Sequence, residues 1–300
     1  MTASRMVAAD ADTVLRHKVL RRIKSRPTTR GAIVLLGILL LLALLAPFIA
    51  PQNPHDLASL SVMDNRLEPG AQGMTGITYW LGTDAQGRDM LSAILYGLRT
   101  SLLVGLASTA GALAIGVLAG LVAAQFGGAI DAAIMRVVDF MLGFPSILIA
   151  LVLLASIGRG VDKVIIAIIL VQWAQYARLM RAAALVERRK EYIEAAVNFG
   201  LPTRHIMLAH LLPNSISSVL VVSTISIANA ITLEATLSFL GVGVPVTQPS
   251  LGLLIANGFE FLLSGEYWIA AFPGIALVLL IMSLNLVGER LRRSFNVRGQ

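Results

Sequence analysis

Six apolar runs constrain the fold of this chain more than any other feature of its sequence. Most are long enough to cross a hydrocarbon core about 30 Å thick, which takes a helix of about 17–25 residues. The chain is 56% apolar and only 14% charged, whereas roughly a quarter of the residues in a soluble domain are charged. We therefore predict an all-α membrane protein with six transmembrane helices, at residues 32–50, 102–125, about 140–157, 164–177 with an extension past Arg178, 216–239 and 268–287.

The distribution of basic residues predicts how these helices are oriented. The net charge is +7, which in a soluble protein would suggest nucleic acid as a partner. If the N-terminus is cytoplasmic, 19 of the 24 Lys and Arg residues lie in cytoplasmic segments, as the positive-inside rule requires. Six spans then place both termini in the cytoplasm. We expect residues 1–50 to hold a retained first span, because the basic region and the apolar run are too long for a signal peptide.

The same runs divide the chain into five parts. We expect a basic cytoplasmic tail at 1–31, a first transmembrane helix at 32–50, an external loop at 51–100, a five-helix core at 101–288 and a cytoplasmic tail at 289–300. The loop is rich in Pro, Gly, Asn and Asp, and its length favours internal structure or a function. In the core, Gly116 and Gly120 form a small-xxx-small pair. We interpret this pair first as a close helix contact within the chain.

Residues 191–214 are the most patterned polar segment of the chain. Positions 191–199 favour a helix with an apolar stripe formed by Ile193, Ala196, Val197 and Gly200. Gly200 can adopt the left-handed conformation that ends a helix, and Pro202 cannot continue that helix. Thr203 has the side chain of an N-cap for a second short helix through about residue 212. Pro213 is then expected to mark a break before the fifth span.

The residues alone leave two interpretations of this segment open. Two short helices that meet at a bend suit docking into a partner, because Ala195 and Ala196 allow close approach and Glu194 offers a carboxylate. The other interpretation is an amphipathic helix on the lipid headgroups, which the basic run 188–190 favours.

The residue spacing of this segment resembles that of the EAA loop in importer-type ABC permeases. Through this loop a membrane subunit of that family binds its ATPase. The family spacing E-A-A-x3-G-x9-I-x-L-P is matched by Glu194, Ala195, Ala196, Gly200, Leu212 and Pro213. His210 departs from it, because the general consensus has Ile there. The resemblance implies that the segment couples to an ATPase through Glu194, Ala195, Ala196, Gly200, Pro202, His210, Leu212 and Pro213.

Other stretches resemble the dipeptide/oligopeptide/nickel branch of these permeases. Residues 81–89 look like its external signature, through Gly82, Thr83, Asp84, Gly87, Arg88 and Asp89. In this branch H-x-L-P-N commonly ends the coupling loop, which accommodates His210. Further matches are residues 234–241, 272–274 and 285–289, and Asp139 with Phe144-Pro145. The resemblance covers about residues 30–295 and points to the C-type subunit, although Leu251 and the Arg-rich C-terminal segment depart from the usual pattern.

This resemblance implies a type I ABC importer permease fold in a bacterial inner membrane. It implies a heteromeric complex with a second homologous permease, two cytosolic ABC ATPase subunits and an external solute-binding protein, working by alternating access. ATP and Mg²⁺ would be bound by the ATPase subunits, and this chain would bind no cofactor itself. The implied cargo is a di- or oligopeptide, and a nickel chelate, glutathione, an opine or an oligosaccharide is the alternative.

Two acidic residues, Glu234 and Asp139, lie within apolar stretches of the sequence. Each side chain is therefore expected to face protein or water rather than lipid. One interpretation places Glu234, together with Ser238 and Asp139, along the translocation path or at its gate. The alternative gives Glu234 a structural partner, either Arg136, Arg88 or a buried backbone donor. For Asp139 we favour a structural role, because Arg136 lies three residues before it on a helix.

Motifs that the sequence lacks argue against other classes of function. The patterns G-x-x-x-x-G-K-[ST], H-E-x-x-H and G-x-S-x-G are absent. The four His are scattered, and the chain has no Cys for disulfides or thiolate metal sites. We therefore predict a transport subunit and not an enzyme, with no catalytic or metal-ligating residues. A passive six-span channel is the alternative from a different class, whereas a secondary transporter would be expected to show inverted repeats.

Overall fold

The computed structural model describes residues 27–56, 60–74 and 76–296. Within these residues the regular secondary structure is helical apart from one short hairpin, β1 (Ala71–Gln72) and β2 (Thr78–Tyr79), and one isolated bridge. Short 3₁₀ turns lie at Val62–Asp64 and Leu262–Ser264, and a π-helical stretch lies at Ile206–Leu211. The helices are α2 (Pro27–Ile49), α3 (Met90–Phe126), α4 (Gly128–Gly143), α5 (Ser146–Ile157), α6 (Val161–Arg188), α7 (Glu191–Asn198), α8 (Thr203–His205), α9 (Leu212–Phe239), α10 (Leu251–Phe259) and α11 (Trp268–Asn296).

Five helical stretches of the described chain are long and apolar enough to cross a membrane, namely α2, α3, α6, Thr203–Phe239 and α11. The third predicted span, at 140–157, is not a single straight helix. It is a pair, α4 and α5, bent by 93° at a short break. Phe144 has extended backbone angles, because the α conformation is sterically disfavoured for a residue that precedes proline. Pro145 also lacks the N–H that would continue the hydrogen bonding of α4. The predicted six spans are therefore present only if this bent pair counts as one.

Several helices extend beyond their predicted ends. α3 begins at Met90 and not near residue 102, because the Asp89 carboxylate caps it by accepting a hydrogen bond from the N–H of Ser92 at 2.8 Å. α11 continues to Asn296, so most of the expected C-terminal tail is helical. α10 was not predicted at all. The N-terminal tail expected at 1–31 lies largely outside the described residues, and its last five residues belong to α2.

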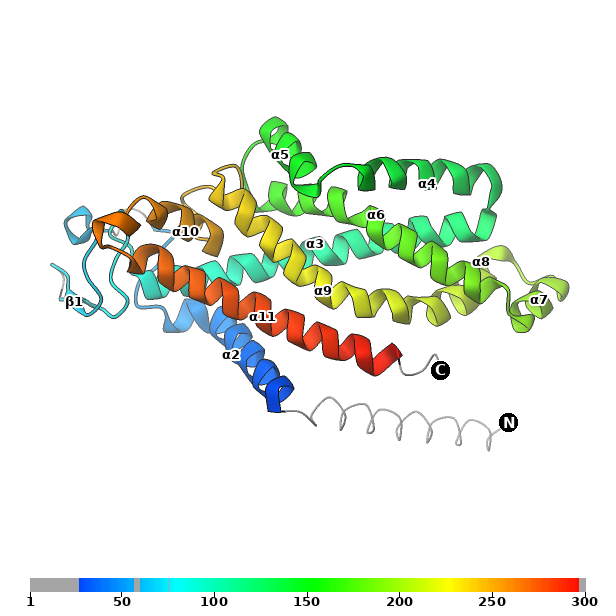
Figure 1. Cartoon of the computed structure of the whole chain (residues 1–300), viewed down its shortest axis with the longest axis horizontal. Helices are drawn as coiled ribbons and strands as arrows, with labels where there is room; N and C mark the ends of the chain where they lie inside the picture. The colour runs from blue at the N-terminus through cyan, green and yellow to red at the C-terminus, as the bar shows by residue number, and fades with distance from the viewer. Residues whose placement is uncertain (1–26, 57–59, 75, 297–300) are drawn as a thin grey trace.

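The helices form an elongated bundle in which α3, α6 and α9 pack against one another (Figure 1). α2 and α11 lie side by side along one edge, and α4 and α5 lie along the other. Glycine allows the close contact between α3 and α6. A Cβ on Gly116 would lie 2.6 Å from the Trp173 carbonyl oxygen, and one on Gly120 would lie 2.9 Å from the Arg181 nitrogen. The predicted small-residue contact within the chain is confirmed.

The bundle has two different ends, which position the candidate sites. One end carries α7, α8 and the turn between α3 and α4, and we call it the α7 end (Figure 1). The other carries the hairpin and α10, and we call it the α10 end. α11 runs from the α10 end toward the α7 end.

Candidate functional site

The 191–214 segment folds as a helix, a tight turn and a second helix. α7 ends in a Schellman motif, because the Gly200 N–H donates to the Val197 carbonyl at 2.9 Å and the Leu201 N–H donates to the Ala196 carbonyl at 3.1 Å. Gly200 has a φ of +71°, as this motif requires, and its Cβ position is open to solvent. Pro202 then begins the second helix. The predicted helix end at Gly200 and Pro202 is confirmed.

The second half of the segment differs from its prediction in two details. Pro202, not Thr203, occupies the N-cap position of α8, and no side chain caps this end. Pro213 causes no break. The helix continues from α8 through the π-helical stretch into α9, and Pro213 lies directly after that stretch as the second residue of α9.

The inner face of α7 anchors it to the bundle. Ile193 and Ala196 are buried in one apolar cluster. This cluster also contains Ile206 and Leu211 of the π-helical stretch, and residues of α3 and α6. The Arg188 guanidinium donates to the Ala124 carbonyl, at the end of α3, at 2.7 Å. The predicted stripe is therefore divided, because Val197 and Gly200 face outward. Buried Ala196 is not available to a partner, whereas Ala195 is.

The outer face of α7 and its turn is exposed and partly apolar. Phe199 is 86% exposed, and Val197 and Leu201 are also exposed. Glu194 and Ala195 lie beside them, exposed. Phe199 did not emerge from the sequence as a site residue, although an aromatic residue in a polar turn directly before the predicted helix-ending glycine was a usable signal. An exposed apolar patch at the end of the bundle is typical of a surface that binds a protein or a membrane.

Tyr192 connects α7 to the two long helices on either side. Its hydroxyl donates to the Glu187 carboxylate of α6 and accepts from the Asn214 amide of α9 at 3.1 Å. Burial and the hydrogen bond to Glu187 raise the pKa of Tyr192 to about 12, so the phenol keeps its proton at physiological pH. The half-buried His210 ring packs edge-on to Tyr192 and His205. Tyr192 therefore joins α7 to both α6 and α9.

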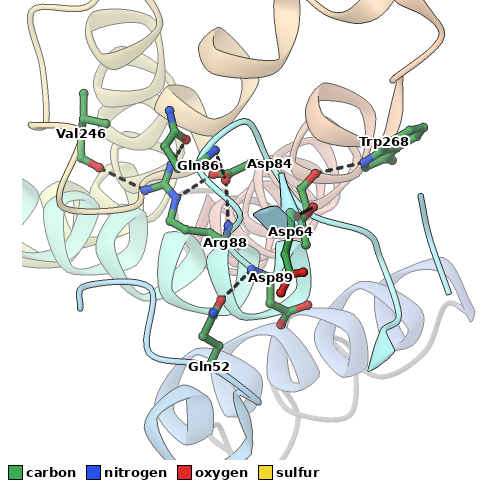
Figure 2. A network of polar contacts seen from close by, with 9 residues as sticks. Gln52, Asp64, Asp84, Gln86, Arg88, Asp89, Val246 and Trp268 are labelled. Atoms are coloured by element: carbon green, nitrogen blue, oxygen red, sulfur yellow. Dashed lines mark hydrogen bonds and ion pairs between the residues drawn. The ribbon is translucent and has the colours of Figure 1, made fainter. Parts of the chain in front are cut away.

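The predicted signature at 81–89 lies at the α10 end and forms a buried polar network (Figure 2). Arg88 is 0% exposed. Its Nε donates to the Asp84 carboxylate at 2.6 Å, and its two terminal nitrogens donate to the Val246 carbonyl at 3.1 Å and to the Gln86 side chain at 3.0 Å. Asp84 also accepts from the N–H groups of Gln86 and Arg88, at 2.9 and 3.0 Å. Each charge is neutralised inside the protein, as a buried ion pair requires.

The neighbouring signature residues fix the same loop to three other parts of the chain. The Thr83 hydroxyl donates to the Asp64 carbonyl at 2.6 Å, and the Thr83 carbonyl accepts from the Trp268 indole of α11 at 3.2 Å. The Asp89 N–H donates to the Gln52 side chain at 2.8 Å, beyond the end of α2 (Figure 2). The signature therefore ties Gln52, Asp64 and Trp268 to one loop.

Gly82 and Gly87 allow this loop to pass close to other backbone. Both have a φ of +76°. A Cβ on Gly82 would lie 2.6 Å from the Leu67 carbonyl oxygen, and one on Gly87 would collide with the Ser61 carbonyl oxygen. Positive φ and close backbone approach are the two conditions that favour glycine.

Glu234 is enclosed between helices. It is 0% exposed, and its two carboxylate oxygens accept from the hydroxyls of Ser101 on α3 at 2.9 Å and Ser238 on α9 at 2.8 Å. Ser238 in turn accepts from the Val244 N–H at 3.3 Å. Of the partners considered from the sequence, the structure provides neither Arg136 nor Arg88. Two hydroxyls take their place and join α3, α9 and the loop before α10.

Asp139 pairs with an arginine that sequence reasoning did not assign to it. Its carboxylate accepts from Arg178 of α6, and not from Arg136 on its own helix. The expectation failed because it considered only neighbours along one helix. A second pair that the sequence did not reveal joins Asp131 of α4 to Arg181 of α6 through two hydrogen bonds. These two ion pairs link α4 to α6. In the described part of the chain, no group of three or more His, Asp or Glu is arranged to hold a metal ion.

Comparison with known proteins decides the family. Residues 116–298 match the family described as binding-protein-dependent transport system inner membrane component. The chain belongs to this family. Residues 15–69 also match the N-terminal transmembrane domain of oligopeptide transport permease C. The chain is thus a permease subunit of an ABC transporter and an inner-membrane component, as the sequence motifs predicted.

Relatives of this permease match it over nearly the whole chain. It is 32% identical over 272 residues to the dipeptide transport system permease protein DppC of Bacillus subtilis (strain 168), covering 91% of this chain and 82% of that protein. It is 35% identical over 263 residues to the di/tripeptide transport system permease protein DppC of Pseudomonas aeruginosa (strain UCBPP-PA14), covering 87% and 85%.

A solved structure confirms the predicted fold. An inward-facing structure of the MetNI methionine ABC transporter matches with a TM-score of 0.55 and 19% identity, over 68% of this chain and 96% of that chain. At this identity the match establishes the shared fold and nothing about cargo.

Proposed function

We propose that this permease forms half of the membrane channel of an ATP-driven, binding-protein-dependent importer of di- and oligopeptides. It pairs with a second homologous permease and with two cytosolic ATPase subunits, which bind the ATP and Mg²⁺. A solute-binding protein delivers the peptide at the α10 end. The α7 end and both termini lie in the cytoplasm, in agreement with the positive-inside distribution of Lys and Arg.

One observation carries the coupling part of this proposal. α7 is rigidly attached on one face, through Ile193 and Ala196, and presents an exposed apolar turn at Phe199 on the other. A partner that binds Phe199 and rotates would move α7, and Tyr192 would pass that movement to α6 and α9. Alternating access needs such a connection, because ATP hydrolysis in one subunit must change the tilt of helices in another.

The peptide cargo is supported by the relatives. Both relatives described above are named for transport of dipeptides or di- and tripeptides, and both match about nine-tenths of this chain. Cargo selection itself is assigned to the binding protein.

The test is a pull-down of the tagged permease in mild detergent, with wild type beside Gly200→Val. Valine is strained at positive φ, so the substitution should deform the turn at Phe199 while meeting no steric clash. We expect wild type to recover a second permease and ATPase subunits, and the variant to lose the ATPases and most peptide uptake.

A matched control is Gly265→Val at the α10 end, because Gly265 has a φ of +88° and an equally open Cβ position. It should retain the ATPases. Full ATPase recovery with Gly200→Val would overturn the coupling assignment, and a permease that purifies alone would favour the passive channel.

A further inference from the structure

A hollow of about 360 Å³ lies where the bent pair α4–α5 faces α6 and α9. Its wall combines Met141, Leu142, Phe144 and Ser146, which lie around the 93° bend, with residues of α6 and α9. The volume is within the range of small-molecule sites. Half of the lining residues are polar, namely Ser146, Gln172, Gln175, Ser226 and Asn229.

These polar groups lie within helices that cross the membrane, where polar side chains face protein or water and not lipid. Gln175 and Asn229 are nonetheless exposed on the surface of this chain. The Gln172 side-chain oxygen is inaccessible and has no hydrogen-bond partner in the described part of the chain. By contrast, the Ser226 hydroxyl donates to the Val222 carbonyl of its own helix. The exposed Gln175 and Asn229 amides can therefore bind a partner from outside this chain, whereas the enclosed Gln172 oxygen can reach one only after the helices around it move.

The hollow offers hydrogen bonds without charge. Its lining contains no Asp, Glu, Lys or Arg, and Glu234 is turned away from it into the cluster with Ser101 and Ser238. A primary amide both donates and accepts, as a peptide group does. An extended peptide presents one such group about every 3.4 Å whatever its side chains are. Neutral amides therefore suit passage of the main chain of many different peptides.

We propose that Gln172, Gln175 and Asn229 line the translocation path and hydrogen-bond to the main-chain amides of the passing peptide. This inference rests on the proposed function, since it names what the importer recognises during passage. The two helices that carry these amides, α6 and α9, are also the two that Tyr192 links to α7. Movement of α7 would thus shift the amide-lined wall directly.

The first test is transport by the complete importer, purified through a tag on this chain and reconstituted with its binding protein, with radiolabelled dialanine as the probe. We expect Gln172→Leu and Asn229→Leu each to reduce uptake about tenfold, by loss of hydrogen bonds to the peptide. ATPase subunits should still copurify. The matched control is Gln125→Leu, because the Gln125 oxygen is likewise buried and unpartnered but lies outside the hollow. Wild-type uptake in both hollow variants would overturn the proposal.

The second test measures water access, and it does not depend on the cargo. The chain has no cysteine, so Asn229→Cys introduces a single thiol. We expect a charged, water-soluble methanethiosulfonate to label it in membrane vesicles holding the assembled importer. Leu220→Cys is the control, because nine residues along α9 place it on the opposite face, where it should stay unlabelled. An unlabelled Asn229→Cys would place this face against lipid or the second permease and overturn the inference.

The two tests separate this inference from the proposed function. If wild-type importer fails to take up dialanine while Asn229→Cys is labelled, the peptide cargo is wrong and the water-filled path stands. If wild type transports the peptide and the hollow variants behave like wild type, the path assignment is wrong and the cargo stands.

Discussion

Arg88 is a charged residue of a type that usually lies on the surface, yet here it is part of the protein interior. Its guanidinium is completely buried and satisfied by Asp84, Gln86 and Val246. A charge in such a place cannot meet a solute in this structure, so Arg88 stabilises the loop that carries it. Nearby, burial and the hydrogen bond to Asp64 raise the pKa of Tyr79 to about 12, so the phenol stays protonated and donates to that carboxylate.

Loss of the Arg88 charge should destabilise the chain strongly. Arg88→Met leaves Asp84 buried without its counter-ion, and breaking a buried pair costs about 3–5 kcal/mol. Thermal unfolding of the detergent-solubilised chain measures the effect. The matched variant is Arg66→Met, which breaks a pair with Glu266 at 3.4 Å whose side chains are 43% and 20% exposed, and such pairs contribute about 0–1 kcal/mol. Equal melting temperatures for the two variants would contradict the structural role of Arg88.

At the scale of elements, α7 is too short to be stable alone, since isolated helices under about 12–15 residues are marginal in water. Its eight residues are held by the buried pair Ile193 and Ala196, by Tyr192 and by the Gly200 turn. Rigidity therefore comes from packing onto α3 and α6. Such a supported element can transmit force, whereas a free interfacial helix could not.

Phe199 should be the main contact of this element with its ATPase partner. Phe199→Ala removes an exposed aromatic group, and truncating such an anchor typically costs about 2 kcal/mol or more of binding. We expect the ATPase affinity to fall by tenfold or more, measured by titrating ATPase subunits onto the permease in nanodiscs. The control is Phe259→Ala, an exposed phenylalanine at the α10 end, which should leave the affinity unchanged. An unchanged affinity for Phe199→Ala would exclude this turn as the contact.

For the whole molecule, the two ends of the bundle have different surfaces and are proposed to face different compartments. The α10 end has a loop locked by buried polar groups, and the α7 end has a protruding turn on a basic background. The ion pairs Asp139–Arg178 and Asp131–Arg181 link α4 to α6.

Single cysteines at the two ends should react from opposite sides of the membrane. Leu263→Cys, at a fully exposed position of the α10 end, should be labelled by an impermeant maleimide in spheroplasts. Phe199→Cys should be labelled only in inverted vesicles from cells that do not express the ATPase subunits, since these subunits would cover the turn. The background is clean because the native chain has no cysteine. Reversed labelling would overturn the orientation proposed from the positive-inside rule.

The sequence by itself determined the helical membrane fold, the approximate position of five spans and the turn at Gly200 and Pro202. These features are local, because they depend on the length of an apolar run or on the backbone preferences of one or two residues. The motifs at 81–89 and 191–214 could also be recognised in the sequence. The buried hydrogen-bond network that the 81–89 residues form at the α10 end could not be predicted from it.

Only the tertiary structure decided which side chains meet. Arg88 binds a carbonyl 158 residues away, and Glu234 binds a hydroxyl 133 residues away. It also assigned Asp139 to Arg178, divided the stripe of α7 into buried and exposed faces, and bent the third span into two helices around a polar hollow. A sequence pattern records periodicity along one helix. These contacts instead depend on how several helices pack against one another, so they could not be predicted from the sequence.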